Sequence, residues 1–83
     1  MEREVGRVVH FFDRIAVAVV ELTQGLERGD QVAFRGPRTD FQQQVDSMQI
    51  DHQEVARGKK GEQIALKVRE RARKGDRVYR VEG

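Results

Sequence analysis

A turn motif that occurs three times constrains the fold of this chain more than any other feature. Each copy reads basic residue, glycine, acidic residue, polar residue and β-branched residue, at 28–32, 60–64 and 74–78. Glycine suits a turn position with positive φ, where a Cβ atom costs energy. The polar and β-branched residues that follow would start a strand in a fixed register, with the β-branched residue facing the core. Three such strand starts in 83 residues predict a small all-β domain.

The abundance of valine and the glycine-rich breaks predict short strands joined by tight turns. The six expected strands lie near residues 5–12, 15–22, 30–35, 41–50, 62–69 and 76–81. Asp13 and Arg14 would form a two-residue hairpin loop, and Pro37 would end the third strand because proline donates no ladder hydrogen bond. A short helix is expected at 51–57. We expect a single domain over residues 1–83, folded as a six-stranded closed barrel of Greek-key type.

No catalytic or metal-binding pattern emerges from the sequence. Cysteine is absent, and His10 and His52 alone cannot complete a structural zinc site. Nothing in the spacing brings these histidines together with Asp13 and Asp51, so ordinary surface or strand histidines are the expected alternative to a metal site. Residues 58–61 lack the spacing and the hydroxyl residue of a phosphate-binding loop. We therefore expect no enzyme, no nucleotide, no metal and no other cofactor.

The start of the chain and its longest apolar run give an expectation about location. The first four residues are followed by no secretory apolar core, and the apolar run at 15–20 is far shorter than the roughly 20 residues that span a bilayer. Together with the absence of cysteine, this predicts a cytoplasmic protein without membrane contact.

Basic residues are concentrated in the last third of the chain. Residues 57–80 contain ten basic and three acidic side chains, whereas residues 1–56 contain six basic and ten acidic ones. If the fifth strand extended past residue 69, alternate cations would share one face at a spacing of roughly 6–7 Å. The candidate nucleic-acid-binding residues are Lys59, Lys60, Lys67, Arg69, Arg71 and Arg73. Two interpretations remain open: contact with an RNA phosphate backbone, or an exposed edge whose charges prevent strand pairing or face an acidic protein.

The second strand is apolar on both faces, unlike a strand with one wet face. Its even-numbered residues lead to Leu22 and its odd-numbered residues to Glu21, so the even set should point inward. The candidate protein-interface residues on the outside are Phe11, Ile15, Val17 and Val19. An exposed apolar patch of this kind is typical of an interface, although a terminal segment at 78–81 would also be able to cover it.

The order of these motifs resembles a known family of barrels. Residues 6–8, 18–22 and 25–34 resemble the second domain of elongation factor Tu and its relatives, as do 56–66 and 74–78. The chain is similar, more closely still, to the small C-terminal barrel of collagenase-like peptidases of family 32, class U. Thr39-Asp40-Phe41 and the stretch at 45–50 carry that second resemblance. Both resemblances imply a closed β-barrel, here standing alone without its enzyme.

Two functions follow as hypotheses. The first is a non-enzymatic, translation-factor-like binding module that contacts transfer or ribosomal RNA, or the translation machinery, through the basic strand. The alternative is an accessory protein-interaction domain that docks on a peptidase-like enzyme, or self-associates, through the apolar first hairpin.

Overall fold

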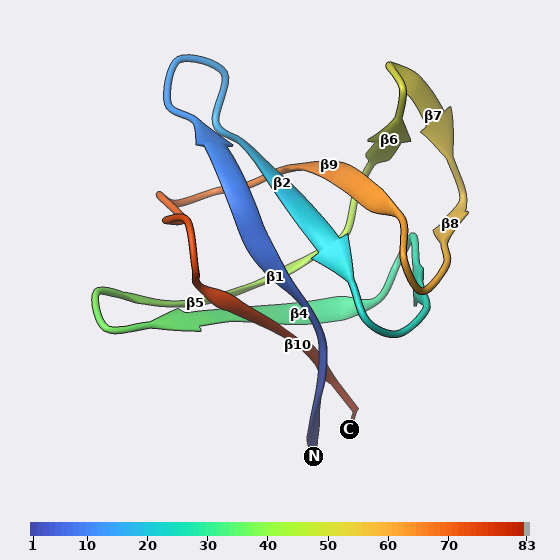
Figure 1. Cartoon of the computed structure of the whole chain (residues 1–83). Coiled ribbons are helices and arrows are strands. Elements are labelled where there is room, and N and C mark those ends of the chain that lie inside the picture. Colours follow the sequence, from blue (N-terminus) through green and yellow to red (C-terminus); the bar gives the residue numbers. More distant parts are fainter. Residues whose placement is uncertain (83) are drawn as a thin grey trace.

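The computed structural model describes residues 1–82, which form ten β-strands and, within that range, no helix (Figure 1). The strands are β1 (Glu2–Phe12), β2 (Val17–Leu22), β3 (Leu26–Glu27), β4 (Gln31–Gly36), β5 (Thr39–Gln44), β6 (Met48–Ile50), β7 (Gln53–Val55), β8 (Arg57–Gly58), β9 (Gln63–Lys67) and β10 (Arg77–Val81). The all-β prediction is therefore confirmed over this range. No segment among the described residues is a helix long and apolar enough to cross a membrane.

The three copies of the turn motif adopt one geometry, as predicted. The glycines have φ between 91° and 97°: Gly29, Gly61 and Gly75. In each copy the acidic side chain accepts a hydrogen bond from the backbone N–H three residues earlier: Asp30 from Glu27 (2.9 Å), Glu62 from Lys59 (2.7 Å) and Asp76 from Arg73 (2.7 Å). The β-branched residue of each copy is fully buried: Val32, Ile64 and Val78. These turns start β4, β9 and β10, and they fix which face of each strand is buried.

Eight strands form one sheet in the order β5-β4-β10-β1-β2-β9-β6-β7, and β3 pairs with β8 in a second, two-stranded sheet. The core lies on the inner face of the curved larger sheet. It contains Phe34 stacked on Phe41, with ring centroids 4.8 Å apart, and the inward residues of β2. Ala18, Val20 and Leu22 are all buried, which confirms the inward direction for these three even-numbered residues, whereas Ala16 lies in the turn before β2 and is only half-buried.

The expected helix at 51–57 is wrong, and so is the single strand at 41–50. Asp51 and His52 form the two-residue loop of the β6–β7 hairpin, because Ile50 pairs with Gln53. The expected strand is divided at Val45, whose backbone N–H and C=O bond to Asp30 and Gly29 in the neighbouring turn. The chain therefore leaves the β4–β5 ladder there and joins β9 as β6.

The prediction of a closed, six-stranded barrel is not borne out, because the sheet remains open in its hydrogen bonding. The two ends of the strand order are β5 and β7, and β9 ends at Lys67, after which the backbone bends at 69–70. The gap between β5 and the chain after β9 is bridged by the buried side chain of Gln43. Its amide donates to the Lys67 carbonyl (2.9 Å) and accepts from the Arg69 N–H (2.8 Å). One side chain thus takes the place of a backbone ladder at this seam.

Candidate interaction site

Four apolar residues gather on the outer face of β1, β2 and β9. Directly paired residues of an antiparallel ladder point to the same side of the sheet. Val17 pairs with Phe12 on β1, and Val19 pairs with Ala65 on β9. Val17 and Val19 are half-buried and alternate with the buried residues of β2, so their side chains face outward. We call Phe12, Val17, Val19 and Ala65 the outer patch.

A β-bulge decides which phenylalanine joins the outer patch. The pairing of β1 with β2 shifts between Val8 and His10, so that one residue of β1 is left over. Phe11 then pairs with buried Ala18, faces inward and packs against the core. The prediction that Phe11 belongs to the outer interface is therefore wrong, and Phe12, with 45% of its surface exposed, takes that place. The sequence offers no signal for this choice, since both residues are phenylalanine.

The turn between β1 and β2 adds a further exposed apolar residue beside the patch. The turn spans residues 13–16 rather than Asp13 and Arg14 alone, and Ile15 in it is 61% exposed. Ala16 has φ of 54°, and its carbonyl accepts a hydrogen bond from the Val68 N–H (2.8 Å).

The alternative that a terminal segment covers the patch is wrong, because β10 (Arg77–Val81) lies between β1 and β4 in the sheet.

The β6–β7 hairpin, which projects beside β9 in Figure 1, flanks the outer patch and forms a hollow with it. The hollow has a volume of about 270 Å³. Its lining is Phe12, Val19, Gln49, Asp51, His52, Gln63, Ile64 and Ala65. Small-molecule sites usually occupy roughly 300–1,000 Å³, so this hollow suits one inserted side chain better than a separate ligand.

Several ion pairs lie elsewhere on the outer face. Arg7 pairs with Glu21 (3.3 Å) and Arg77 with Glu4 (2.9 Å). Arg35 contacts both Glu2 and Asp40. The hydrogen bond from Arg35 lowers the pKa of the Glu2 carboxyl, and the same contact raises the pKa of the Arg35 guanidinium. We call these seven residues the charged face: Glu2, Glu4, Arg7, Glu21, Arg35, Asp40 and Arg77.

The structure does not form the predicted basic strand face. β9 ends at Lys67, and residues 68–76 belong to no strand. Arg69, Arg71 and Arg73 therefore lie on an irregular segment, and the strand period that would have aligned their side chains does not apply to it. Lys59 and Lys60 lie before β9, at the other end of that strand from Lys67 and roughly 13 Å away along it. The six candidate nucleic-acid-binding residues thus fall into two groups.

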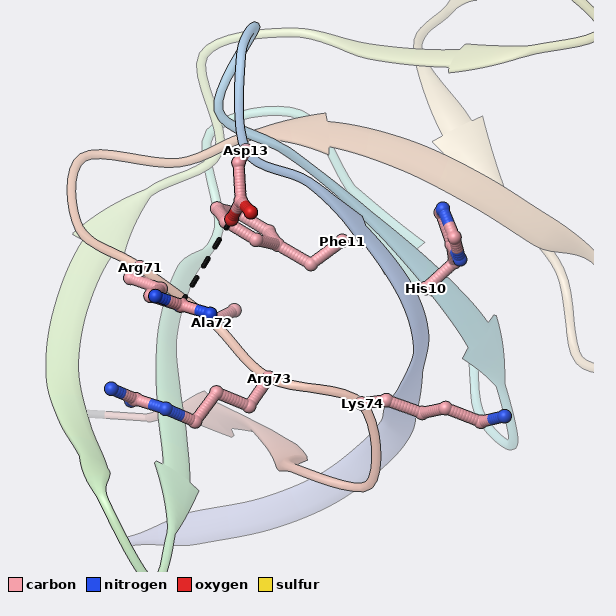
Figure 2. A pocket seen from close by; sticks show the side chains of 7 residues that line it. All are labelled: His10, Phe11, Asp13, Arg71, Ala72, Arg73 and Lys74. Atoms are coloured by element: carbon pink, nitrogen blue, oxygen red, sulfur yellow. Dashed lines mark ion pairs between the residues drawn. The ribbon is translucent and has the colours of Figure 1, made fainter.

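The second half of the basic segment, which we define as residues 67–74, borders a hollow with β1. Its lining is His10, Phe11, Asp13, Arg71, Ala72, Arg73 and Lys74 (Figure 2). Arg71 reaches toward Asp13, with 4.0 Å between Nε and Oδ1. Arg73 points the other way from Lys74 and donates hydrogen bonds to the Arg38 carbonyl and the Thr39 hydroxyl. Two of the five cations in this segment, Arg71 and Arg73, are therefore in contact with other parts of the protein.

The two histidines do not form a metal centre with their neighbours. The ring of His10 packs edge-on against that of Phe12, with centroids 4.3 Å apart, and His52 lines the hollow at the outer patch. Within the described residues, no group of three or more His, Cys, Asp and Glu side chains is placed to hold a metal ion.

Proteins named as a protease and a collagenase are similar in sequence to this chain. An uncharacterized protease of Methanocaldococcus jannaschii is 43% identical over 77 residues, which cover 92% of this chain and 19% of that protein. A collagenase of Porphyromonas gingivalis is 34% identical over 80 residues, covering 94% of this chain and 22% of its own length. This chain thus spans about a fifth of the length of the curated relatives it matches. No family model matches the chain.

A solved structure agrees with the sequence matches. The C-terminal domain of a Geobacillus thermoleovorans protein assigned as a U32 peptidase superposes with a TM-score of 0.88 at 18% identity. The match covers 94% of this chain and 91% of that domain. This chain is similar to the C-terminal domain of U32 peptidases. The predicted likeness to collagenase-like peptidases is thereby confirmed, whereas the likeness to the second domain of elongation factor Tu is not.

Proposed function

We propose that this chain is a non-catalytic accessory domain that packs against a peptidase-type domain. One observation carries the proposal: nearly the whole chain matches about a fifth of a protease five times its length. The same fold occurs as a C-terminal domain in a protein assigned as a U32 peptidase. A unit that accompanies a much larger part in its relatives is expected to share a surface with that part.

The composition of the chain supports a non-catalytic role. The sequence contains no cysteine and a single serine, Ser47. Nucleophilic or metal-assisted peptide hydrolysis needs a nucleophile with a base, or a ligand cluster for a metal. Among the described residues, no three or more His, Cys, Asp and Glu side chains lie together so as to hold a metal ion. We therefore assign hydrolysis in the relatives to the part of their sequence outside the matched segment.

Protein contact is better supported than the translation-factor-like alternative. An RNA site of the predicted kind needs its cations on one continuous surface. The six candidates instead lie at the two ends of β9, and Arg73 is held by Arg38 and Thr39. The outer patch, by contrast, brings apolar residues of three adjacent strands into directly paired positions.

The test is association with a peptidase-type domain. The M. jannaschii protease without its matching 77-residue segment would be prepared, checked for cooperative unfolding, and titrated with this chain by calorimetry. We expect a saturable 1:1 complex and no peptide hydrolysis by this chain alone. Failure to associate, both on mixing and on co-expression, would refute the accessory role, and hydrolysis by the isolated chain would refute the non-catalytic assignment.

A further inference from the structure

All three non-glycine residues with positive φ in the described part of the chain border the outer patch. Ala16 (φ 54°) directly precedes Val17 in the β1–β2 turn. Asp51 (φ 53°) and His52 (φ 66°) form the β6–β7 loop and line the hollow that contains Phe12 and Val19. Left-handed backbone costs roughly 1–2 kcal/mol for a residue with a Cβ atom. The non-glycine residues with left-handed backbone in the described part of the chain therefore lie together at one surface.

One side chain in the β6–β7 loop, that of His52, is not the one that the turn itself prefers. A two-residue hairpin loop with positive φ at both positions is a type I′ turn, which favours Asn-Gly, Asp-Gly or Gly-Gly, so that Asp51 suits the first position and His52 stands where glycine is preferred. The chain does place glycine at the left-handed position of each of its three strand-starting turns. At the hollow it carries Asp51 and His52 instead. Strained residues that persist where glycine would relieve them are typical of binding sites.

The hollow itself combines an apolar wall with a polar rim. Phe12, Val19 and Ala65 form the wall, and Gln49, Asp51, His52 and Gln63 supply amide, carboxylate and imidazole groups. An apolar side chain would fill the space between the strands and the hairpin, and the rim could hydrogen-bond to the backbone that carries it. This arrangement is typical of an anchor position in a protein interface.

We propose that the outer patch and its hollow receive an apolar side chain of the peptidase-type domain. This inference rests on the proposed function and adds the surface and the kind of contact. The occupant is inferred from the lengths of the relatives. About four fifths of each relative lies outside the matched segment, and that larger part would be the nearest large protein surface to this domain. The choice of the outer patch as the contact follows from its contrast with the charged face, whose charges are paired with one another and need no apolar cover.

The experiment measures the dissociation constant of this chain for the truncated M. jannaschii protease described above. Val19→Asp should weaken binding at least about thirtyfold, as expected for a central interface residue. His52→Gly should weaken it by about threefold or more while raising the thermal midpoint of the isolated chain, because glycine relieves the left-handed backbone. A gain in stability together with a loss of affinity cannot arise from unfolding. The control Arg69→Glu with Arg71→Glu should change binding by less than about twofold, because neither residue lines the hollow at the outer patch.

The outcomes separate this inference from the proposed function. If the unmodified chain does not bind, the accessory role fails, and the surface assignment fails with it. If it binds and both patch variants bind equally well, only the surface assignment is overturned. If the arginine double variant abolishes binding instead, the contact lies on the basic segment. A chain that self-associates through Val19 at the same concentrations would make a second copy, not the peptidase-type domain, the occupant.

Discussion

The charged face and the outer patch meet on the same two strands, one ladder position apart. Arg7 on β1 faces Glu21 on β2, and the ion pair leaves both charges in water. At the next outward position His10 faces Val19, followed by Phe12 facing Val17. The backbone pairing is continuous across this boundary except for the bulge at Val9, so the difference lies in the side chains.

This comparison shows which outer surface the chain leaves to solvent. Paired surface charges contribute little to stability, with typical values of about 0–1 kcal/mol, but they keep a sheet face soluble. Exposed apolar side chains on an outer strand face are unfavourably hydrated, so their burial against another surface lowers the free energy. The contrast within two strands therefore supports the proposal that the outer patch, not the sheet as a whole, is the contact surface.

The largest effect should distinguish the two faces of β2. Val20 is fully buried, and Val20→Asp would place an unpaired carboxylate in the core, with an expected loss of more than about 4 kcal/mol. Val19→Asp on the outer face should cost about 1 kcal/mol or less in the isolated chain. Urea unfolding of both variants provides the measurement. Equal losses would mean that Val19 already serves as a core residue, and the outer patch would not be an independent surface.

The next effect concerns the seam where the sheet stays open. Gln43→Ala removes both hydrogen bonds to the chain after β9 and should cost about 1–3 kcal/mol, because the backbone groups at Lys67 and Arg69 lose their partner. Gln44→Ala is the matched control, since its exposed amide makes one bond to the Gly29 carbonyl (3.2 Å). Unfolding midpoints that fall equally in the two variants would contradict a special role for Gln43 at the seam.

A smaller effect should separate the two kinds of turn. Gly75→Ala forces a Cβ atom into left-handed backbone (φ 95°) and should destabilise the chain by about 1 kcal/mol. His52→Gly should have the opposite sign and a similar size of about 1 kcal/mol. Differential scanning calorimetry of the isolated chain reads both shifts. A destabilised His52→Gly variant would show that the imidazole has a structural role that outweighs the strain.

The smallest effect should come from the charged face and appear in the fall of the thermal midpoint at acid pH. The Arg35 contact lowers the pKa of Glu2 in the folded chain, so its stabilising contribution is present above the ordinary pKa of a glutamate. That contribution is lost as the pH falls through the lowered folded value. Glu2→Gln should therefore flatten part of the fall in thermal midpoint between about pH 5 and pH 2. High salt should weaken the contribution of the Glu2–Arg35 pair in the parent chain. If the thermal midpoint of the variant falls with pH as steeply as that of the parent, the pair contributes nothing to stability.

The sequence by itself determined the strand starts and the direction of the inner face. Gly29, Gly61 and Gly75 take the positive φ that the repeated motif implies, and the β-branched residue after each turn is buried. These features are local, because a turn and the first two residues of a strand depend on their own backbone and on the two-residue side-chain period. The inward direction of the even residues of β2 follows from the same period.

Only the tertiary structure decided how those strands make a surface. The bulge at Val9 put Phe12 rather than Phe11 on the outer face. The bend after Lys67 broke the predicted row of basic residues and left the sheet open. Pairing of Met48 with Leu66 brought the β6–β7 loop beside the patch. Each depends on how a segment pairs with its neighbouring strand, for which the local pattern carries no signal. The physical reason is the same throughout. Local periodicity fixes the face of a strand, whereas the register and end of a ladder are fixed by the neighbouring strand.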